Sequence, residues 1–262
     1  MKTSLPKPIL MLACAACLVT GVYGAHMAAT PSEALFLYLN RGEGDPAEIA
    51  KFVAKGADVN YRDPEYQITP LHNTVHYKEI EASKLLIKLG ADVNARNGEG
   101  TTPLYTAVHQ ESLELTHLLV EKGADVNARN NFGYSPLRQA CRWGSLDAVG
   151  FLIAKGANVN VRDNDGDTPL HIAASEGNGR VAALLIEKKA NVNAAGSIGN
   201  TPLHRAVAKG DVAIVRLLLA AGADVSIKNK HGQTPMDLAS QLLPDEDREI
   251  PDLLIQAGKA KI

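Results

Sequence analysis

The phrase Thr168-Pro-Leu-His171 decides the fold, because close variants of it recur along the chain at intervals of 33 residues. The six copies begin at Thr69, Thr102, Ser135, Thr168, Thr201 and Thr234. Equal intervals of this length indicate a tandem repeat. A second phrase, of the type Gly-Ala-Asp-Val-Asn, follows each of the first five copies after 21 residues, and one further copy occupies 56–60. The sequence therefore predicts repeated units preceded by a shortened first unit.

Each unit has the residues of two helices joined by a turn. Thr or Ser can cap a helix by accepting a backbone N–H, and Pro fits the first helical turn because its missing N–H would be unsatisfied there. Five residues after the cap stands Ala, or Thr74 in one unit, which lets neighbouring helices approach closely. A pair of mostly Leu residues marks the second helix, and Gly in the left-handed region ends it. Segments such as 130–133 have the composition of a tight turn between units.

The repeat length and the Thr-Pro-Leu-His-x-Ala motif resemble those of the ankyrin repeat family. The resemblance covers about residues 31–260 and implies an all-α repeat solenoid of stacked helix-turn-helix units with projecting β-hairpin loops. We expect one ankyrin-repeat domain at 31–262. Within it we expect an N-terminal cap at 31–60, repeats at about 61–226 and a C-terminal cap at about 227–262. Asp45-Pro-Ala-Glu48 has the pattern of a capping box at the start of a helix.

Three departures from the repeat pattern predict local differences. Lys189 stands where the other units end their second helix with Gly, which is unfavourable if the backbone keeps a positive φ. The first hairpin is one residue longer than the others and carries Pro64 and Gln67 in place of the usual Gly. In the last unit the Leu pair comes three residues late, so its second helix should begin late, with Pro251 near the first turn.

The N-terminal residues predict an exported protein. Lys2 and Lys7 precede a mostly apolar stretch of 14 residues, and small residues surround Gly24, as in a secretory signal. We therefore expect a signal peptide at 1–24, a short linker at 25–30 and a periplasmic or secreted protein. A lipoprotein anchored at Cys17 or Cys14 is the alternative. The apolar stretch is too short to cross a bilayer of ~30 Å, so we expect no membrane span.

Composition and motifs argue against several other functions. The formal net charge is −2 and Lys and Arg do not cluster, so nucleic acid is not an expected partner. In the family, the histidine of the Thr-Pro-Leu-His motif bonds the neighbouring backbone, which gives His72, His171 and His204 a structural role. Residues 163–167 resemble a calcium loop only superficially, because the Gly is displaced by one position. Cys141 is expected to be a buried apolar group, and we expect no cofactor, no metal and no enzymatic activity.

The positions that the repeat leaves free predict where a partner binds. In this family the hairpin tips and the exposed face of each first helix line the concave side. Five of the aromatic residues of this chain, including its only Trp, fall on these positions. Aromatic residues and Arg dominate binding energy at protein interfaces. The predicted partner-binding residues are Tyr66, Tyr77, Tyr105, Phe132, Tyr134, Arg142, Trp143 and Asp165.

An acidic rim is expected beside this patch, formed by Asp163, Asp165, Asp167 and Glu176, and it favours a basic partner. We therefore expect a monomeric, non-catalytic protein-protein interaction module that acts as an adaptor, accessory or immunity protein. Resemblance to exported bacterial ankyrin proteins suggests a peroxide-defence enzyme or a secreted toxin as the partner. The alternative is a periplasmic hydrolase or metal-binding protein that uses His76, His109 and nearby acids. Stacked helices lie ~8–10 Å apart, which is too far for these two histidines to share a zinc ion without distortion.

Overall fold

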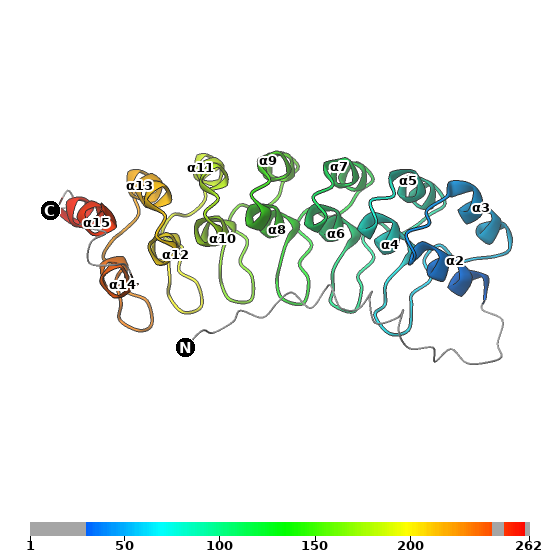
Figure 1. The fold of residues 1–262 in the computed structure, drawn as a ribbon, viewed down its shortest axis with the longest axis horizontal. Coiled ribbons are helices and arrows are strands. Elements are labelled where there is room, and N and C mark those ends of the chain that lie inside the picture. The colour runs from blue at the N-terminus through cyan, green and yellow to red at the C-terminus, as the bar shows by residue number, and fades with distance from the viewer. Residues whose placement is uncertain (1–29, 243–248, 260–262) are drawn as a thin grey trace.

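The computed structural model describes residues 30–242 and 249–259 (Figure 1). The predicted signal peptide at 1–24, with Cys14 and Cys17, lies outside the described residues, as does the expected linker except for Thr30. Within the described ranges the chain forms 14 helices and no strand. None of these helices is long and apolar enough to cross a membrane.

The helices form pairs that stack side by side in two layers, so the prediction of an all-α repeat solenoid is confirmed (Figure 1). The first helices of the units are α2 (Pro31–Leu39), α4 (Pro70–His76), α6 (Pro103–His109), α8 (Pro136–Trp143), α10 (Pro169–Glu176), α12 (Pro202–Lys209) and α14 (Pro235–Leu242). The second helices are α3 (Pro46–Ala54), α5 (Ile80–Lys88), α7 (Leu113–Glu121), α9 (Leu146–Ala154), α11 (Gly179–Glu187), α13 (Val212–Ala220) and α15 (Glu249–Lys259). Loops project from the layer of first helices.

Each projecting loop ends in a short turn that we call a finger. One backbone hydrogen bond of 2.9–3.1 Å closes each finger, for example from Asn130 N to Tyr134 O at 3.1 Å. The fingers are residues 63–68, 97–101, 130–134, 163–167, 196–200 and 229–233. The predicted β-hairpin loops are thus tight turns without regular strands. The first finger has the extra residue that the sequence predicts, and Gln67 takes a φ of 56° there.

The motif histidines join neighbouring repeats. In His204, Nδ1 accepts the N–H of Thr201 at 3.1 Å, and Nε2 lies 3.1 Å from the carbonyl oxygen of Gln233 in the next unit. His72 and His171 make the equivalent contacts, and all three rings are buried. This arrangement confirms their predicted structural role.

A ladder of asparagines also connects the units, and the sequence analysis did not anticipate it. The amide of Asn94 donates to the carbonyl of Gly123 at 3.0 Å, and its Oδ1 accepts the N–H of Asp125 at 2.8 Å. The same pair of bonds recurs at Asn60, Asn127, Asn160 and Asn193. These amides satisfy backbone groups at helix ends that would otherwise lack partners.

The core lies between the units rather than inside any one of them. The second Leu of each pair is fully buried, as are the small residues five positions after the cap. These Leu residues are Leu86, Leu119, Leu152, Leu185 and Leu218. A unit cannot bury such a face alone, so the stack gains its stability from contacts between neighbours. Cys141 belongs to this core, and burial raises the pKa of its thiol, which suits an inert apolar group.

The capping box predicted at Asp45 is wrong. Asp45 caps its helix through the N–H of Ala47 at 2.8 Å, while Glu48 contacts Lys51 at 2.6 Å on the helix surface. The capping box lies instead at the start of α2. There Thr30 N donates to Glu33 Oε2 at 2.8 Å, and Glu33 N donates to Thr30 Oγ at 3.2 Å. In the last unit, α15 begins late at Glu249, as predicted.

Lys189 has a φ of 68°, which confirms the expected strain at this helix end. We expect Lys189→Gly to raise the free energy of unfolding by about 1 kcal/mol, because Gly has no Cβ to clash in the left-handed region. The melting temperature should rise by roughly 2–4 °C. Lys188→Gly is the matched control, because Lys188 has a φ of −82° and its replacement should lower the melting temperature. A lower midpoint for Lys189→Gly would contradict this reading.

Candidate partner-binding surface

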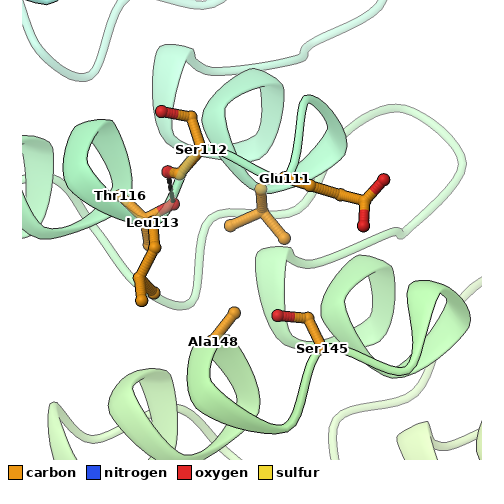
Figure 2. Close-up of a pocket in the computed structure, with 7 residues that line it drawn as sticks. Glu111, Ser112, Leu113, Thr116, Ser145 and Ala148 are labelled. Carbon is orange, nitrogen blue, oxygen red and sulfur yellow. Dashed lines mark hydrogen bonds between the residues drawn. The ribbon is translucent and has the colours of Figure 1, made fainter.

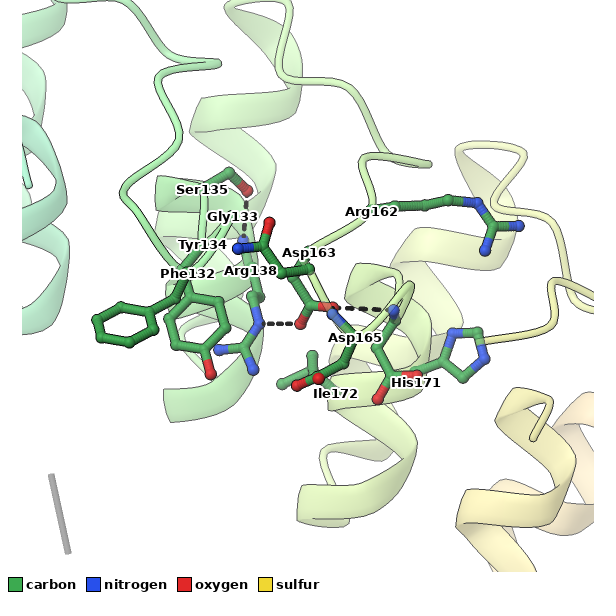
Figure 3. A network of polar contacts seen from close by, with 12 residues as sticks. Phe132, Gly133, Tyr134, Ser135, Arg138, Arg162, Asp163, Asp165, His171 and Ile172 are labelled. Carbon is green, nitrogen blue, oxygen red and sulfur yellow. Dashed lines mark hydrogen bonds and ion pairs between the residues drawn. The ribbon is translucent and has the colours of Figure 1, made fainter. Parts of the chain in front are cut away.

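The third full repeat presents two aromatic residues on its finger. Asn130 Oδ1 accepts the N–H groups of Phe132 at 3.0 Å and of Tyr134 at 2.9 Å, which fixes the turn. The two rings lie beside one another with centroids 5.7 Å apart (Figure 3). Phe132 is exposed and Tyr134 is half-buried. The finger therefore holds an apolar side chain in solvent on a fixed backbone.

Arg138 supports this finger from α8. Its guanidinium lies 3.5 Å from the centroid of the Tyr134 ring, a cation–π contact. Its Nε donates to Asp163 Oδ2 at 2.7 Å (Figure 3), and the Asp163 side chain is almost fully buried. Asp163 Oδ1 in turn accepts the N–H groups of Asp165 and Asp167. Arg138 thus replaces the motif histidine as the link between two repeats.

The predicted acidic rim is wrong in two of its four members. Asp163 and Asp167 are buried, and each is paired with an arginine, Asp167 with Arg205 at 2.6 Å. The sequence pattern assigned them to solvent because it does not show which side chain a neighbouring repeat supplies, here Arg138 from the preceding repeat and Arg205 from the following one. Asp165 and Glu176 remain exposed, and Glu176 lies 3.8 Å from Arg142.

The end of α8 presents Trp143 and Arg142. The Trp143 side chain is 45% exposed, and its ring meets His109 edge-on with centroids 5.7 Å apart. The Arg142 guanidinium lies 5.9 Å from the centroid of the Trp143 ring. His109 Nδ1 is bonded to Gln139 Nε2 at 2.8 Å. Trp143 is therefore supported from the neighbouring repeat.

Tyr105 does not present its ring to a partner, and its inclusion among the partner-binding residues is wrong. The residue is only 9% exposed, and its hydroxyl donates to Gln139 Oε1 at 3.0 Å. Burial raises the pKa of Tyr105 to about 12, so the hydroxyl keeps its proton and its donor role. Tyr105 instead orients Gln139, which holds the His109 ring that contacts Trp143.

The first full repeat contributes Tyr66 and Tyr77, both of which are exposed. The Tyr77 hydroxyl donates to the carbonyl of Asn40 at 2.8 Å, and its ring packs edge-on against His76 at 5.0 Å between centroids. His76 Nδ1 is bonded to Gln110 Nε2 at 3.0 Å. Tyr77 is thus held by the preceding unit through Asn40 and by His76, which is itself bonded to the following unit.

The two histidines of the enzymatic alternative pack against the exposed aromatic side chains, His76 against Tyr77 and His109 against Trp143. His76 and His109 are each engaged by a glutamine amide of the following repeat, and burial lowers the pKa of both rings. Among the described residues no three His, Cys, Asp or Glu side chains gather into a group that could hold a metal.

A small cavity of about 20 Å³ lies between α7 and α9 (Figure 2). Such a volume is close to that of one water molecule.

Sequence reasoning missed the glutamines that connect these residues. Gln110 and Gln139 bond His76 and His109 across repeat boundaries, and Gln139 also accepts the hydroxyl of Tyr105. The two glutamines lie at different positions of their repeats, so no periodic signal marked them. Reasoning also missed Ile198, which is exposed at the finger position that Phe132 occupies two repeats earlier. An aliphatic residue there lacked the aromatic character that drew attention to the others.

Comparisons with known proteins agree with this architecture. A family model described as "Ankyrin repeats (3 copies)" matches residues 36–130 and 127–196, and one described as "Ankyrin repeats (many copies)" matches 185–239. The crystal structure of the human ASB11 ankyrin repeat domain superposes with a TM-score of 0.73 and 25% sequence identity. The match covers 85% of this chain and 96% of that domain. No curated protein sequence matches significantly.

Proposed function

The chain belongs to the ankyrin repeat family, and from this premise we propose that it is a non-catalytic module that binds another protein through its fingers and first helices. Repeats of this family are in general protein-protein interaction modules. The observation that carries the proposal is a row of exposed aromatic side chains on rigid supports. Phe132, Trp143 and Tyr77 are exposed, and each stands on a backbone or ring fixed by neighbouring contacts.

Rigid aromatic residues favour binding because little conformational entropy is lost when they are covered by a partner. Trp143 is held by His109, and Tyr77 is held by Asn40 and His76. We centre the proposed surface on the third full repeat, where Phe132 is exposed on the finger, Arg142 and Trp143 are exposed at the end of α8, and Tyr134 is half-buried. Tyr66 and Tyr77 extend it toward the N-terminal units.

We place this module in the periplasm or outside the cell after signal cleavage, with a lipoprotein anchored at Cys17 or Cys14 as the second form. Its role there would be that of an adaptor, accessory or immunity protein acting as a monomer. A peroxide-defence enzyme and a secreted toxin are the two partner classes proposed.

The test is a comparison of two double variants in affinity capture from a periplasmic extract. Phe132→Ala with Trp143→Ala removes the centre of the surface and leaves Tyr134 in its contact with Arg138. We expect partner capture to weaken at least tenfold, because truncating residues at the centre of an interface costs about 2 kcal/mol or more each.

The matched control is Leu89→Ala with Leu113→Ala, which removes two exposed apolar side chains at the end of α5 and the start of α7. This control should leave capture unchanged. Equal capture by both double variants would refute the proposed surface. Circular dichroism of each variant verifies that the fold is retained.

A further inference from the structure

At one position of the fingers the type of side chain alternates from repeat to repeat, and only some of these residues belong to the proposed surface. We call this position the tip row: Tyr66, Glu99, Phe132, Asp165, Ile198 and His231. The apolar members Tyr66, Phe132 and Ile198 are 38%, 52% and 43% exposed. Carboxylates stand between them at Glu99 and Asp165. The first five members of the row thus alternate apolar and acidic side chains from one finger to the next, and His231 ends the alternation.

Backbone hydrogen bonds fix the spacing of the tip row. The carbonyl of Tyr66 accepts the N–H of Gly98 at 2.7 Å, and the carbonyl of Phe132 accepts the N–H of Asn164 at 3.2 Å. The carbonyls of Glu99, Asp165 and Ile198 accept equivalent bonds from the following finger at 2.7–2.9 Å. These five carbonyls are therefore already engaged. A partner strand would find no free ladder of backbone acceptors along the tips.

The distance between tips follows from the stacking of the units. Each finger leads directly into the first helix of its unit, and stacked helices lie ~8–10 Å apart. Neighbouring tips are therefore ~10 Å apart, and apolar tips are ~20 Å apart. An α-helix rises about 1.5 Å per residue, so seven residues cover ~10.5 Å and complete nearly two turns. Every seventh residue of a helix laid along the fingers would meet one tip.

We propose that the tip row binds an amphipathic helix of the partner through residues seven apart that are alternately apolar and basic. This inference rests on the proposed function, because it names the partner element that this side of the molecule takes. Apolar residues of the helix would cover Tyr66, Phe132 and Ile198, and Lys or Arg would face Glu99 and Asp165. A helix satisfies its own backbone hydrogen bonds, so it can bind to tips that offer only side chains.

The arginines near the fingers bond backbone carbonyls rather than the carboxylates of the tip row. Arg96 donates to the carbonyl of Arg129 at 2.7 Å, and Arg162 donates to the carbonyls of Ala195 at 2.6 Å and Gly166 at 2.8 Å. Arg129 Nε donates to the carbonyl of Gly133 at 3.1 Å. The ion pairs of the described residues include neither Glu99 nor Asp165.

The experiment uses a labelled synthetic helix of 29 residues with Leu at positions 1, 15 and 29 and Lys at positions 8 and 22. Its binding to the full chain is measured by fluorescence anisotropy. We expect saturable binding that weakens at least tenfold in Ile198→Ser. Glu99→Lys with Asp165→Lys should weaken binding by a similar factor, and a peptide with Glu at positions 8 and 22 should restore it to this double variant.

Three outcomes would overturn the proposal: equal binding of a peptide with the same residues in shuffled order, no recovery with the charge-reversed peptide, or stronger binding of a proline-rich peptide with Leu and Lys at every third residue. The last would mean a polyproline helix, whose pitch of ~9.3 Å also approaches the finger spacing. Trp143→Ala should leave peptide binding intact. Failure of the peptide while Phe132→Ala with Trp143→Ala still weakens partner capture would reject the helix and keep the proposed function.

Discussion

The free energy of unfolding should fall by about 1.4 kcal/mol per pH unit, because of the buried His72 alone, as the pH drops below 6.5. Burial lowers the pKa of His72 to about 4, and burial also lowers the pKa of His171 and His204. Between the unfolded and the folded pKa, the unfolded chain binds protons that the folded chain does not. The contribution of His72 to stability is therefore complete above pH 6.5 and is lost as the pH falls toward 4, and His171 and His204 act in the same direction.

The hydrogen bonds explain why these rings resist protonation. In each ring Nδ1 accepts the backbone N–H of the capping Thr, and Nε2 faces a carbonyl oxygen of the next repeat. Nε2 therefore carries the only ring proton. A second proton on Nδ1 would face this N–H beside the Thr Oγ that lies 2.8–2.9 Å away, so the charged form loses the backbone hydrogen bond as well as its hydration. The carboxylate of Asp167 opposes this effect in part at His171.

The measurement is urea unfolding of the chain between pH 7.5 and pH 5, a window above the range where ordinary carboxylates titrate. His72 alone should give a slope of the unfolding free energy with pH of about 1.4 kcal/mol per unit, and the other buried histidines add to it with the same sign. His72→Gln should lower the slope by about this amount, whatever its effect on absolute stability. A slope near zero, or one that His72→Gln leaves unchanged, would show that His72 titrates normally.

Removal of the Arg138 side chain should produce the second large decrease in the free energy of unfolding. Arg138→Ala leaves the almost fully buried carboxylate of Asp163 without its cation, and breaking a buried pair in this way costs about 3–5 kcal/mol. The lost stacking on Tyr134 adds to this cost. Urea unfolding at pH 7 should show the loss as a lower midpoint.

Asp163→Asn should rescue most of that loss when it is combined with Arg138→Ala. Asn97 and Asn130 occupy the position of Asp163 in the two preceding repeats, and their Oδ1 atoms accept the same two backbone N–H groups. A neutral amide therefore fits this turn without a cation. We expect the double variant to regain all but about 1 kcal/mol. If the double variant stays as unstable as Arg138→Ala, the cost arises from the lost Tyr134 contact instead.

The ankyrin repeat fold could be predicted from the sequence because it depends on local chemistry that recurs with a fixed period. Thr or Ser followed by Pro starts the first helix of each unit, and a Leu pair placed on the second helix requires a neighbour to cover it. Lys189 was identified in the same way, because the equivalent residues of the other repeats are Gly. Lys78 and Glu111 escaped notice, although they occupy the position that is Gly144, Gly177 and Gly210 in later repeats. Their φ values are also positive, at 59° and 55°.

The candidate site was predicted only in part, because burial of a side chain at a free position depends on a residue about 30 positions away. Tyr105 and Trp143 both lie on first helices. Tyr105 is buried and its hydroxyl donates to Gln139, whereas Trp143 is exposed. Asp163 and Asp165 lie two residues apart, yet only Asp163 meets Arg138.

The sequence by itself determined the helices, their caps and the repeat that stacks them, since each depends on residues close together in the chain. Only the tertiary structure decided which side chains of the fingers and first helices reach solvent. Stacking brings residues from adjacent units within hydrogen-bonding distance, and the chemistry of each such pair, a ring on an amide or a guanidinium on a carboxylate, determines whether the side chain is withdrawn or displayed.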